Sequence, residues 1–191
     1  MKKLPVIALI ALSGIASARA DIIPSFAGTT QGAGSNTVWN YTIDITTSQQ
    51  VTTGDFFTIY DFGPFVAGSN TQPAGWTFSS SLSTTPPFGT NPPDNPTLAD
   101  LTWTYTGSAS LPTGTNMGGF SVTLATSLFQ ATPSTRNAYF AAQGTRTTAQ
   151  GSKINNVGQI PVPVPIPEPT TLSLLAVAGV GSALRAIRRR K

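Results

Sequence analysis

The sequence predicts an all-β protein, with one antiparallel β-sandwich between two terminal segments of different character. Apolar and polar residues alternate with a period of two in several short segments, as expected when one face of a strand is buried. Runs rich in Gly and Pro separate these segments, and no helical pattern occurs between residues 21 and 160. Only 9% of the residues are charged, and another 9% are aromatic. This composition favours a folded domain over a disordered chain.

The clearest alternation lies in residues 38–45, where Trp39, Tyr41, Ile43 and Ile45 are separated by polar side chains. This spacing places the four large groups on one face of a strand. Further strands are expected at residues 56–62, 76–82, 101–106, 120–124 and 138–142. Six or seven strands joined by turns indicate two packed sheets of the immunoglobulin-like or jelly-roll type. The expected core includes Trp39, Ile43, Trp103, Tyr105, Phe120 and Val122.

The sandwich domain is expected to span residues 21–145. Residues 86–96 contain five prolines, which lack the N–H that a strand ladder needs, so they are expected to form a long connection. Residues 146–166 hold few large side chains and end in alternating prolines, so a linker and a stiff Pro-rich stalk are expected there. The chain has no cysteine, so packing must hold this domain together without disulfides.

Residues 1–20 have the three parts of a secretory signal peptide. Lys2 and Lys3 give a positive start, and residues 4–15 are mostly apolar. Ala18 and Ala20 place small side chains at the two positions that a signal peptidase reads, so cleavage is expected before Asp21. These features predict that the protein is exported from the cytoplasm.

The C-terminal segment, residues 167–191, also has three parts. It begins with Pro167, Glu168 and Pro169, and residues 170–184 carry no charge. As a helix, the uncharged part would be about 22 Å long. It would need a few more residues to span roughly 30 Å of hydrocarbon. A basic cluster ends the chain and favours a cytoplasmic position for that end. The cluster comprises Arg185, Arg188, Arg189, Arg190 and Lys191.

In this order, the Pro-Glu-Pro triplet, the apolar helix and the basic tail resemble the PEP-CTERM sorting signal of Gram-negative bacteria. The resemblance covers residues 167–191. It implies that an exosortase-type enzyme processes a precursor held transiently in the inner membrane. It also implies a mature form at the cell surface or in the extracellular matrix, with exopolysaccharide as a further partner. The alternative is an ordinary C-terminal anchor that is never processed.

The exported segment is mildly acidic, although the whole chain has a formal net charge of +4. Most Lys and Arg residues lie in the two terminal segments. Residues 21–169 contain three cations against seven anions, which gives a net charge of −4. Nucleic acid is therefore not an expected partner.

No catalytic residue and no cofactor are expected, because the chain contains neither histidine nor cysteine. Ser-His-Asp and Cys-His catalysis in their ordinary forms are thereby excluded, as are His-ligated zinc and iron sites. A hydrolase would need paired carboxylates from Asp44, Asp55, Asp61, Asp94 or Asp100. Asp55 and Asp61 flank one expected strand, but Asp at such positions usually bonds its own backbone in a turn. A protein that is not an enzyme is therefore expected.

Two weaker binding candidates remain. Calcium needs several hard oxygen ligands at one place, and Asp94, Asn95 and Asp100 offer three within a short segment. Their spacing matches no EF-hand, so a solvated loop without metal is the expected structure. Trp76 follows a Pro-Ala-Gly turn and is the tryptophan expected to be most exposed, where its ring could stack on a sugar.

Three functions stay open for the exported domain. The preferred one is a structural or adhesive protein of the cell surface or exopolysaccharide matrix. The alternative is a carbohydrate-binding module, and the remote alternative is an Asp-dependent hydrolase. Burial of all three tryptophans would favour the structural protein, and an exposed Trp76 beside a groove would favour the binding module. Two Asp carboxylates facing each other across a cleft would favour the hydrolase.

Overall fold

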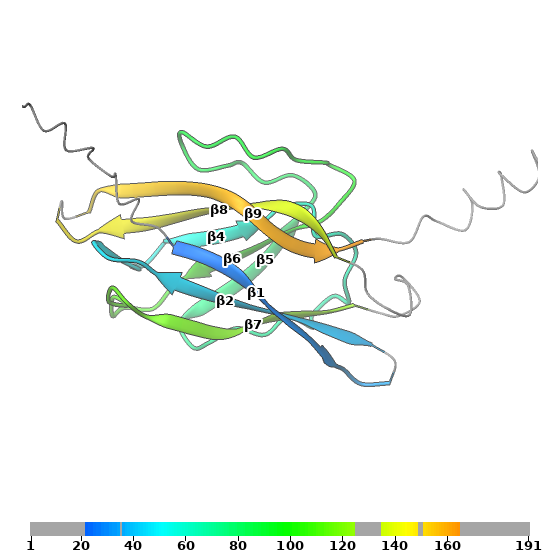
Figure 1. Ribbon diagram of the computed structural model, residues 1–191. Helices are drawn as coiled ribbons and strands as arrows, with labels where there is room; N and C mark the ends of the chain where they lie inside the picture. Colours follow the sequence, from blue (N-terminus) through cyan, green and yellow to red (C-terminus); the bar gives the residue numbers. More distant parts are fainter. Residues whose placement is uncertain (1–21, 35, 125–134, 149–150, 165–191) are drawn as a thin grey trace, which may run out of the picture.

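The computed structural model describes residues 22–34, 36–124, 135–148 and 151–164 (Figure 1). Every regular element in these ranges is a β-strand. In chain order the strands are β1 (Ile22–Gln31), β2 (Thr37–Ile45), β3 (Gln49–Gln50), β4 (Phe56–Ile59), β5 (Trp76–Ser81), β6 (Asp100–Tyr105), β7 (Asn116–Leu124), β8 (Thr135–Arg146) and β9 (Lys153–Pro163). The described part of the chain is therefore all-β, as the alternation predicted.

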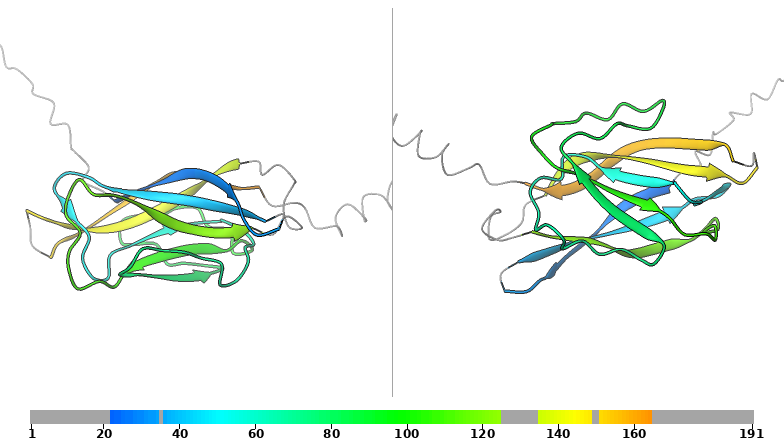
Figure 2. Two further views of the ribbon diagram at one scale, coloured as in Figure 1. Left: turned by 90° about the horizontal axis from the view of Figure 1, so that it is seen from below. Right: turned by 180° about the vertical axis from the view of Figure 1, so that it is seen from behind.

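The strands form two antiparallel sheets. One sheet has the order β1-β2-β7. The other has the order β3-β8-β4-β6-β5, with β9 paired to β8. Seen from below, the β1-β2-β7 sheet lies over β5 and β6 as a separate layer (Figure 2, left). Two facing antiparallel sheets are consistent with a β-sandwich.

Aromatic side chains from the two sheets meet in the core. Phe57 on β4 and Phe120 on β7 have ring centroids 5.1 Å apart in an edge-to-face arrangement. Tyr41 on β2 and Trp103 on β6 have centroids 6.5 Å apart. Such pairs add about 0.5–1.5 kcal/mol to the stabilisation from burial. The core residues expected from the alternation are all buried, namely Trp39, Ile43, Trp103, Tyr105, Phe120 and Val122.

Strand β9 lies where the sequence pattern predicted a linker and a stalk. It pairs with β8 along its whole length, from Lys153 opposite Thr145 to Pro163 opposite Thr135. Pro161 and Pro163 are two residues apart, so both backbone nitrogens can face away from β8, on the side of β9 that pairs with no strand in the described chain. The β domain therefore extends to Pro163 and does not end at residue 145.

Side-chain hydrogen bonds also connect β9 to the other sheet. The Tyr41 hydroxyl donates to the carbonyl oxygen of Pro161 at 3.0 Å, and the Asn156 amide donates to the carbonyl oxygen of Ile22 at 3.0 Å. Strand β1, which begins at Ile22, is likewise absent from the sequence prediction. It alternates weakly and contains Pro24, which is accepted because β1 pairs only with β2.

The predicted terminal segments lie outside the described residues. These are the signal peptide with Ala18, Ala20 and Asp21, and the sorting segment 167–191 with Pro167, Glu168, Pro169 and the basic cluster. Within the described ranges, no helix has the length and apolar character needed to cross a membrane.

Candidate functional site

Three carboxylates converge at one end of the β4-β6 strand pair. Ile59 at the end of β4 lies opposite Leu101 on β6. Residues that follow β4 and residues that begin β6 therefore meet at the same end of the sheet. Asp61 follows β4, and Asp100 is the first residue of β6. Asp94 comes from residues 82–99, the long Pro-rich connection between β5 and β6.

Asp61 changes the direction of the backbone after β4. Its φ of 55° lies in the left-handed region, which Asp tolerates better than most residues. The strand expected at residues 56–62 is therefore shorter and ends at Ile59. The N–H of Asp61 donates to Oδ1 of Asp100 at 2.9 Å, and Oδ1 of Asp61 accepts from the N–H of Asn95 at 2.7 Å. Arg136 on β8 donates to the carbonyl oxygen of Asp61.

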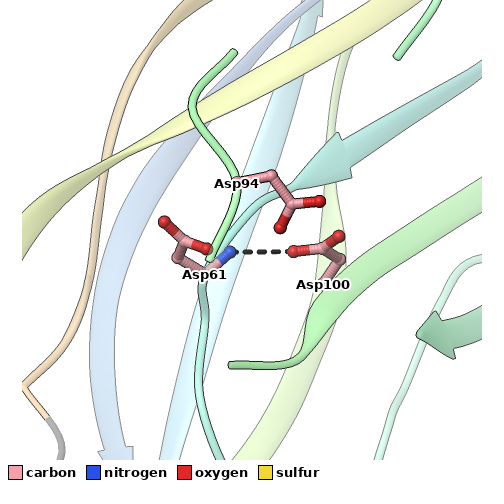
Figure 3. A group of neighbouring side chains, drawn as sticks. All are labelled: Asp61, Asp94 and Asp100. Carbon is pink, nitrogen blue, oxygen red and sulfur yellow. Dashed lines mark hydrogen bonds between the residues drawn. The ribbon is translucent and has the colours of Figure 1, made fainter. Parts of the chain in front are cut away.

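These bonds bring the three side chains together as an acidic cluster of Asp61, Asp94 and Asp100. One carboxylate oxygen from each lies within 4.8 Å of the other two (Figure 3). Asp100 is fully buried, Asp61 is half-buried and Asp94 is exposed. Oδ2 of Asp94 accepts a hydrogen bond from the Ser83 hydroxyl at 3.3 Å. The acidic cluster therefore has one end in the protein interior and the other in contact with solvent.

Asp100 is the least satisfied member of the acidic cluster. Its Oδ2 is buried and makes no hydrogen bond of ordinary distance and angle, although the nearby Thr84 side chain interacts with the Asp100 carboxylate. Burial raises the pKa of Asp100, and the charges of Asp94 and Asp61 raise it further, while the Asp61 N–H and the Thr84 side chain lower it. Burying a polar group without a partner costs about 1–3 kcal/mol, and more when the group is charged.

Tyr60 supplies a second buried oxygen without a partner. Its side chain is fully buried, and its hydroxyl makes no hydrogen bond. Burial raises the pKa of Tyr60, and the negative charges of Asp100 and Asp94 raise it further. The Tyr60 hydroxyl therefore stays protonated at neutral pH within electrostatic range of the acidic cluster.

The chemistry that this arrangement supports is limited by access. Carboxylate oxygens are hard ligands that suit hard cations such as calcium and magnesium. A general acid or base must come within hydrogen-bond reach of a substrate. Asp100 is 0% exposed, so it cannot contact a polymer substrate in this conformation. The acidic cluster thus suits ion binding better than hydrolysis.

Asp55 lies beyond the opposite end of β4 and is a different kind of site. Its Oδ1 accepts from Nζ of Lys153 at 2.6 Å, and its Oδ2 accepts from the Thr52 N–H and the Thr145 hydroxyl, each at 2.8 Å. Both oxygens of this buried carboxylate are therefore satisfied. The bond to Thr52 is of the local turn type that sequence reasoning expected for such an Asp.

The pairs considered from the sequence are rearranged in the structure. Asp55 and Asp61 lie beyond opposite ends of β4 and do not form a pair. Asp94 and Asp100 do come together, but with Asp61 as the third carboxylate. The side-chain oxygen of Asn95 instead accepts from the N–H and hydroxyl of Thr97, at 3.1 and 2.9 Å. Asp61 lies beside Asp100 because β4 pairs with β6, so a prediction of that strand pairing would have brought the two residues together.

Trp76 is buried, contrary to the exposed position expected from its turn. It is 4% exposed, and its ring packs against Phe57, Tyr105 and Phe120 at centroid distances of 5.9, 5.3 and 5.1 Å. Trp39 and Trp103 are fully buried as well. None of the three tryptophans presents a ring face for stacking on a sugar. Phe88 on the Pro-rich connection is 95% exposed instead.

Comparisons with known proteins give little further information. No protein-family model matches the chain, and no curated protein sequence is similar to it. Similar solved structures include AvmM, which catalyses macrocyclization in alchivemycin A biosynthesis. AvmM has 9% sequence identity to this chain and a TM-score of 0.36, over 78% of this chain and 90% of its own. A TM-score this low supports no argument about function.

Proposed function

We propose that this chain is an exported protein of the cell surface or extracellular matrix, with a structural or adhesive role and no enzymatic activity. A signal peptide directs export, and a PEP-CTERM-type signal at residues 167–191 directs sorting. In this proposal the β domain is a sandwich of the immunoglobulin-like or jelly-roll type. The partners are a signal peptidase, an exosortase-type enzyme and, transiently, the inner membrane.

The burial of all three tryptophans is the observation that carries this choice. A carbohydrate-binding module of the kind considered from the sequence needs an exposed ring, and Trp39, Trp76 and Trp103 are at most 4% exposed. A domain that uses its large aromatic residues for packing gains stability instead of a ligand platform. An exported protein that has no cysteine to form disulfides needs this stability from packing.

A carbohydrate-binding role stays as the second candidate because of Phe88. Its ring is 95% exposed, and Pro86 and Pro87 precede it in the chain. The backbone of this segment is fixed to β9, since the Asn155 amide donates to the carbonyl oxygen of Phe88 at 2.8 Å. A supported, exposed aromatic ring can stack on a sugar. Loss of polysaccharide binding in Phe88→Ala would favour this second candidate.

The sorting proposal is tested by following release of the protein in a host that has an exosortase. Glu168→Ala leaves the apolar helix and the basic tail intact, so insertion should persist while release into the medium stops. Thr170→Ala, just outside the triplet, is the matched control and should be released normally. Efficient release of the Glu168→Ala protein would show that the triplet is only a spacer.

A further inference from the structure

The acidic cluster carries negative charge that no Lys or Arg side chain neutralises through an ion pair in the described part of the chain. Among the described residues, the one ion pair joins Lys153 to Asp55. Arg136 approaches the acidic cluster, but it bonds to the carbonyl oxygen of Asp61 rather than to a carboxylate. Three like charges within 4.8 Å of one another repel strongly, and burial of Asp100 increases the effect. A cation at the centre would convert this repulsion into attraction.

The carboxylate of Asp100 supplies a second observation that favours a bound cation. Oδ1 of Asp100 is held by the Asp61 N–H, so the orientation of the carboxylate is fixed. Oδ2 is then left buried without a hydrogen bond of ordinary distance and angle, and the nearby Thr84 side chain does not complete one. Buried polar atoms in native proteins almost always have a partner. A bound metal ion would satisfy this oxygen without a donor hydrogen.

We propose that Asp61, Asp94 and Asp100 bind one calcium ion at the end of the β4-β6 strand pair. Each residue contributes at least one carboxylate oxygen, and water completes the coordination on the exposed side at Asp94. This site goes beyond the structural or adhesive function proposed above, and only its expected affinity range rests on the proposed export.

The charges and ligands favour calcium over other metals. The three carboxylates carry a formal charge of −3, and nearby Arg136 carries +1, so a divalent ion balances the region. Zinc generally takes nitrogen and sulfur ligands, and the chain has no His or Cys. Magnesium requires near-ideal octahedral geometry, whereas calcium accepts irregular sets of six to eight oxygens. Ligands from three separate segments of the chain suit the less demanding ion.

The ion would fasten the Pro-rich connection to the sheet. Asp94 belongs to that connection, whereas Asp61 and Asp100 lie at the ends of paired strands. At this end the connection is already held by the bond from the Asn95 N–H to Asp61 and by bonds from the Phe62 and Gly63 N–H groups to the carbonyl oxygen of Ala99. Calcium coordination would add Asp94 to these links, so that the connection is held at Asp94 as well as at Phe88, whose carbonyl oxygen accepts from Asn155. Exported calcium modules typically bind with a Kd of about 10⁻⁴–10⁻³ M, so this site would be filled outside the cell and empty in the cytoplasm.

The test is calorimetric titration of the full-length chain, in mild detergent, with calcium chloride after removal of metals by a chelator. We expect one site with a Kd of about 10⁻⁴–10⁻³ M. At a hundredfold excess of calcium over Kd, the melting temperature should rise by roughly 5–10 °C. Amide hydrogen exchange in residues 82–99 should slow under the same conditions.

Three variants and one control distinguish calcium binding at this site from non-specific attraction of calcium to acidic residues. Asp94→Asn changes an exposed side chain and should fold normally, and it should weaken calcium binding by about tenfold or more through the lost charge. Asp61→Asn and Asp100→Asn should also weaken calcium binding. Each Asn keeps a side-chain oxygen that can accept the hydrogen bond now made by the Asp. Asp44→Asn on β2 is the matched control and should bind like the parent. The proposal is overturned if calcium does not bind at 10 mM free ion (about ten times the weakest expected Kd), if Asp94→Asn binds equally well, or if magnesium binds with the same affinity.

Discussion

Asp55 and Asp100 are both fully buried aspartates at the starts of adjacent antiparallel strands, yet only Asp55 has both carboxylate oxygens bonded. Lys153 and two threonines surround Asp55. The Asp61 N–H holds one oxygen of Asp100, and the other oxygen makes no hydrogen bond of ordinary distance and angle. The β4-β6 pair therefore has a buried carboxylate in an ion pair at one end and, at the other, a cluster of carboxylates that forms no ion pair among the described residues.

Lys153→Met should destabilise the domain, because it leaves the buried Asp55 carboxylate without its cation. We expect a loss of about 1–3 kcal/mol in the free energy of unfolding, with hydrogen bonds from Thr52 and Thr145 limiting the effect. Urea denaturation gives this value directly. Adding Asp55→Asn to the same chain should restore part of the loss. If Lys153→Met alone were as stable as the parent, the ion pair would contribute nothing to the free energy of unfolding.

Trp103→Ala should cost about 3–5 kcal/mol, since it empties a fully buried position between the sheets. Thermal unfolding followed by circular dichroism measures the change. Phe88→Ala is the control, because its ring is exposed and should contribute less than about 0.5 kcal/mol. Equal effects of the two substitutions would contradict the packing of the core.

Ile160→Ala tests whether the segment after residue 145 belongs to the folded domain. Ile160 is 1% exposed on β9, whereas Val157 on the same strand is 41% exposed. A core strand predicts a loss of about 2–5 kcal/mol for Ile160→Ala and a much smaller one for Val157→Ala. A linker would show no loss at either position. Chemical denaturation of the two variants side by side distinguishes these cases.

Asp100 should impose a pH dependence with a definite sign. Burial and the neighbouring charges of Asp94 and Asp61 raise its pKa in the folded state above the ordinary value of 3.8. Its contribution to stability is therefore fully present below that ordinary value and is lost as the pH rises through the folded pKa. Asp94, Asp61 and Tyr60 are the other titratable groups near it, and the Tyr60 hydroxyl, whose pKa is raised, stays protonated throughout the acidic range.

The measurement compares the parent with Asp100→Asn in the presence of a chelator, at several pH values from 3 to 8. The difference in free energy of unfolding, parent minus variant, should fall as the pH rises. A difference that stays level or grows would show that the folded protein does not resist ionisation of Asp100.

The alternation of side chains was enough to predict the central strands. Residues 38–45 and 101–106 alternate cleanly because one face of each is buried and the other carries Asn, Asp or Thr. Strands β1 and β9 lack this pattern and contain prolines, which a strand paired on one side accepts where the nitrogen faces away from its partner. Their prediction requires the sheet order, and the sequence pattern does not contain it.

The acidic cluster shows the same limit. Asp94 and Asp100 are close in sequence, and their hard oxygen ligands could be recognised there. Asp61 joins them only because β4 pairs with β6, a contact between residues far apart in the chain. The predicted exposure of Trp76 is wrong for a related reason. The preceding turn indicates the end of a strand, but Phe120 from the opposite sheet covers the ring.

The intact mass of the native protein, with its N- and C-terminal sequences, tests the central claim most directly. If the terminal segments are address signals on a structural surface protein, the mature chain should begin at Asp21 and end close to the Pro167-Glu168-Pro169 triplet, without the basic tail. A mature chain that still ends at Lys191, or still begins at Met1, would contradict the account.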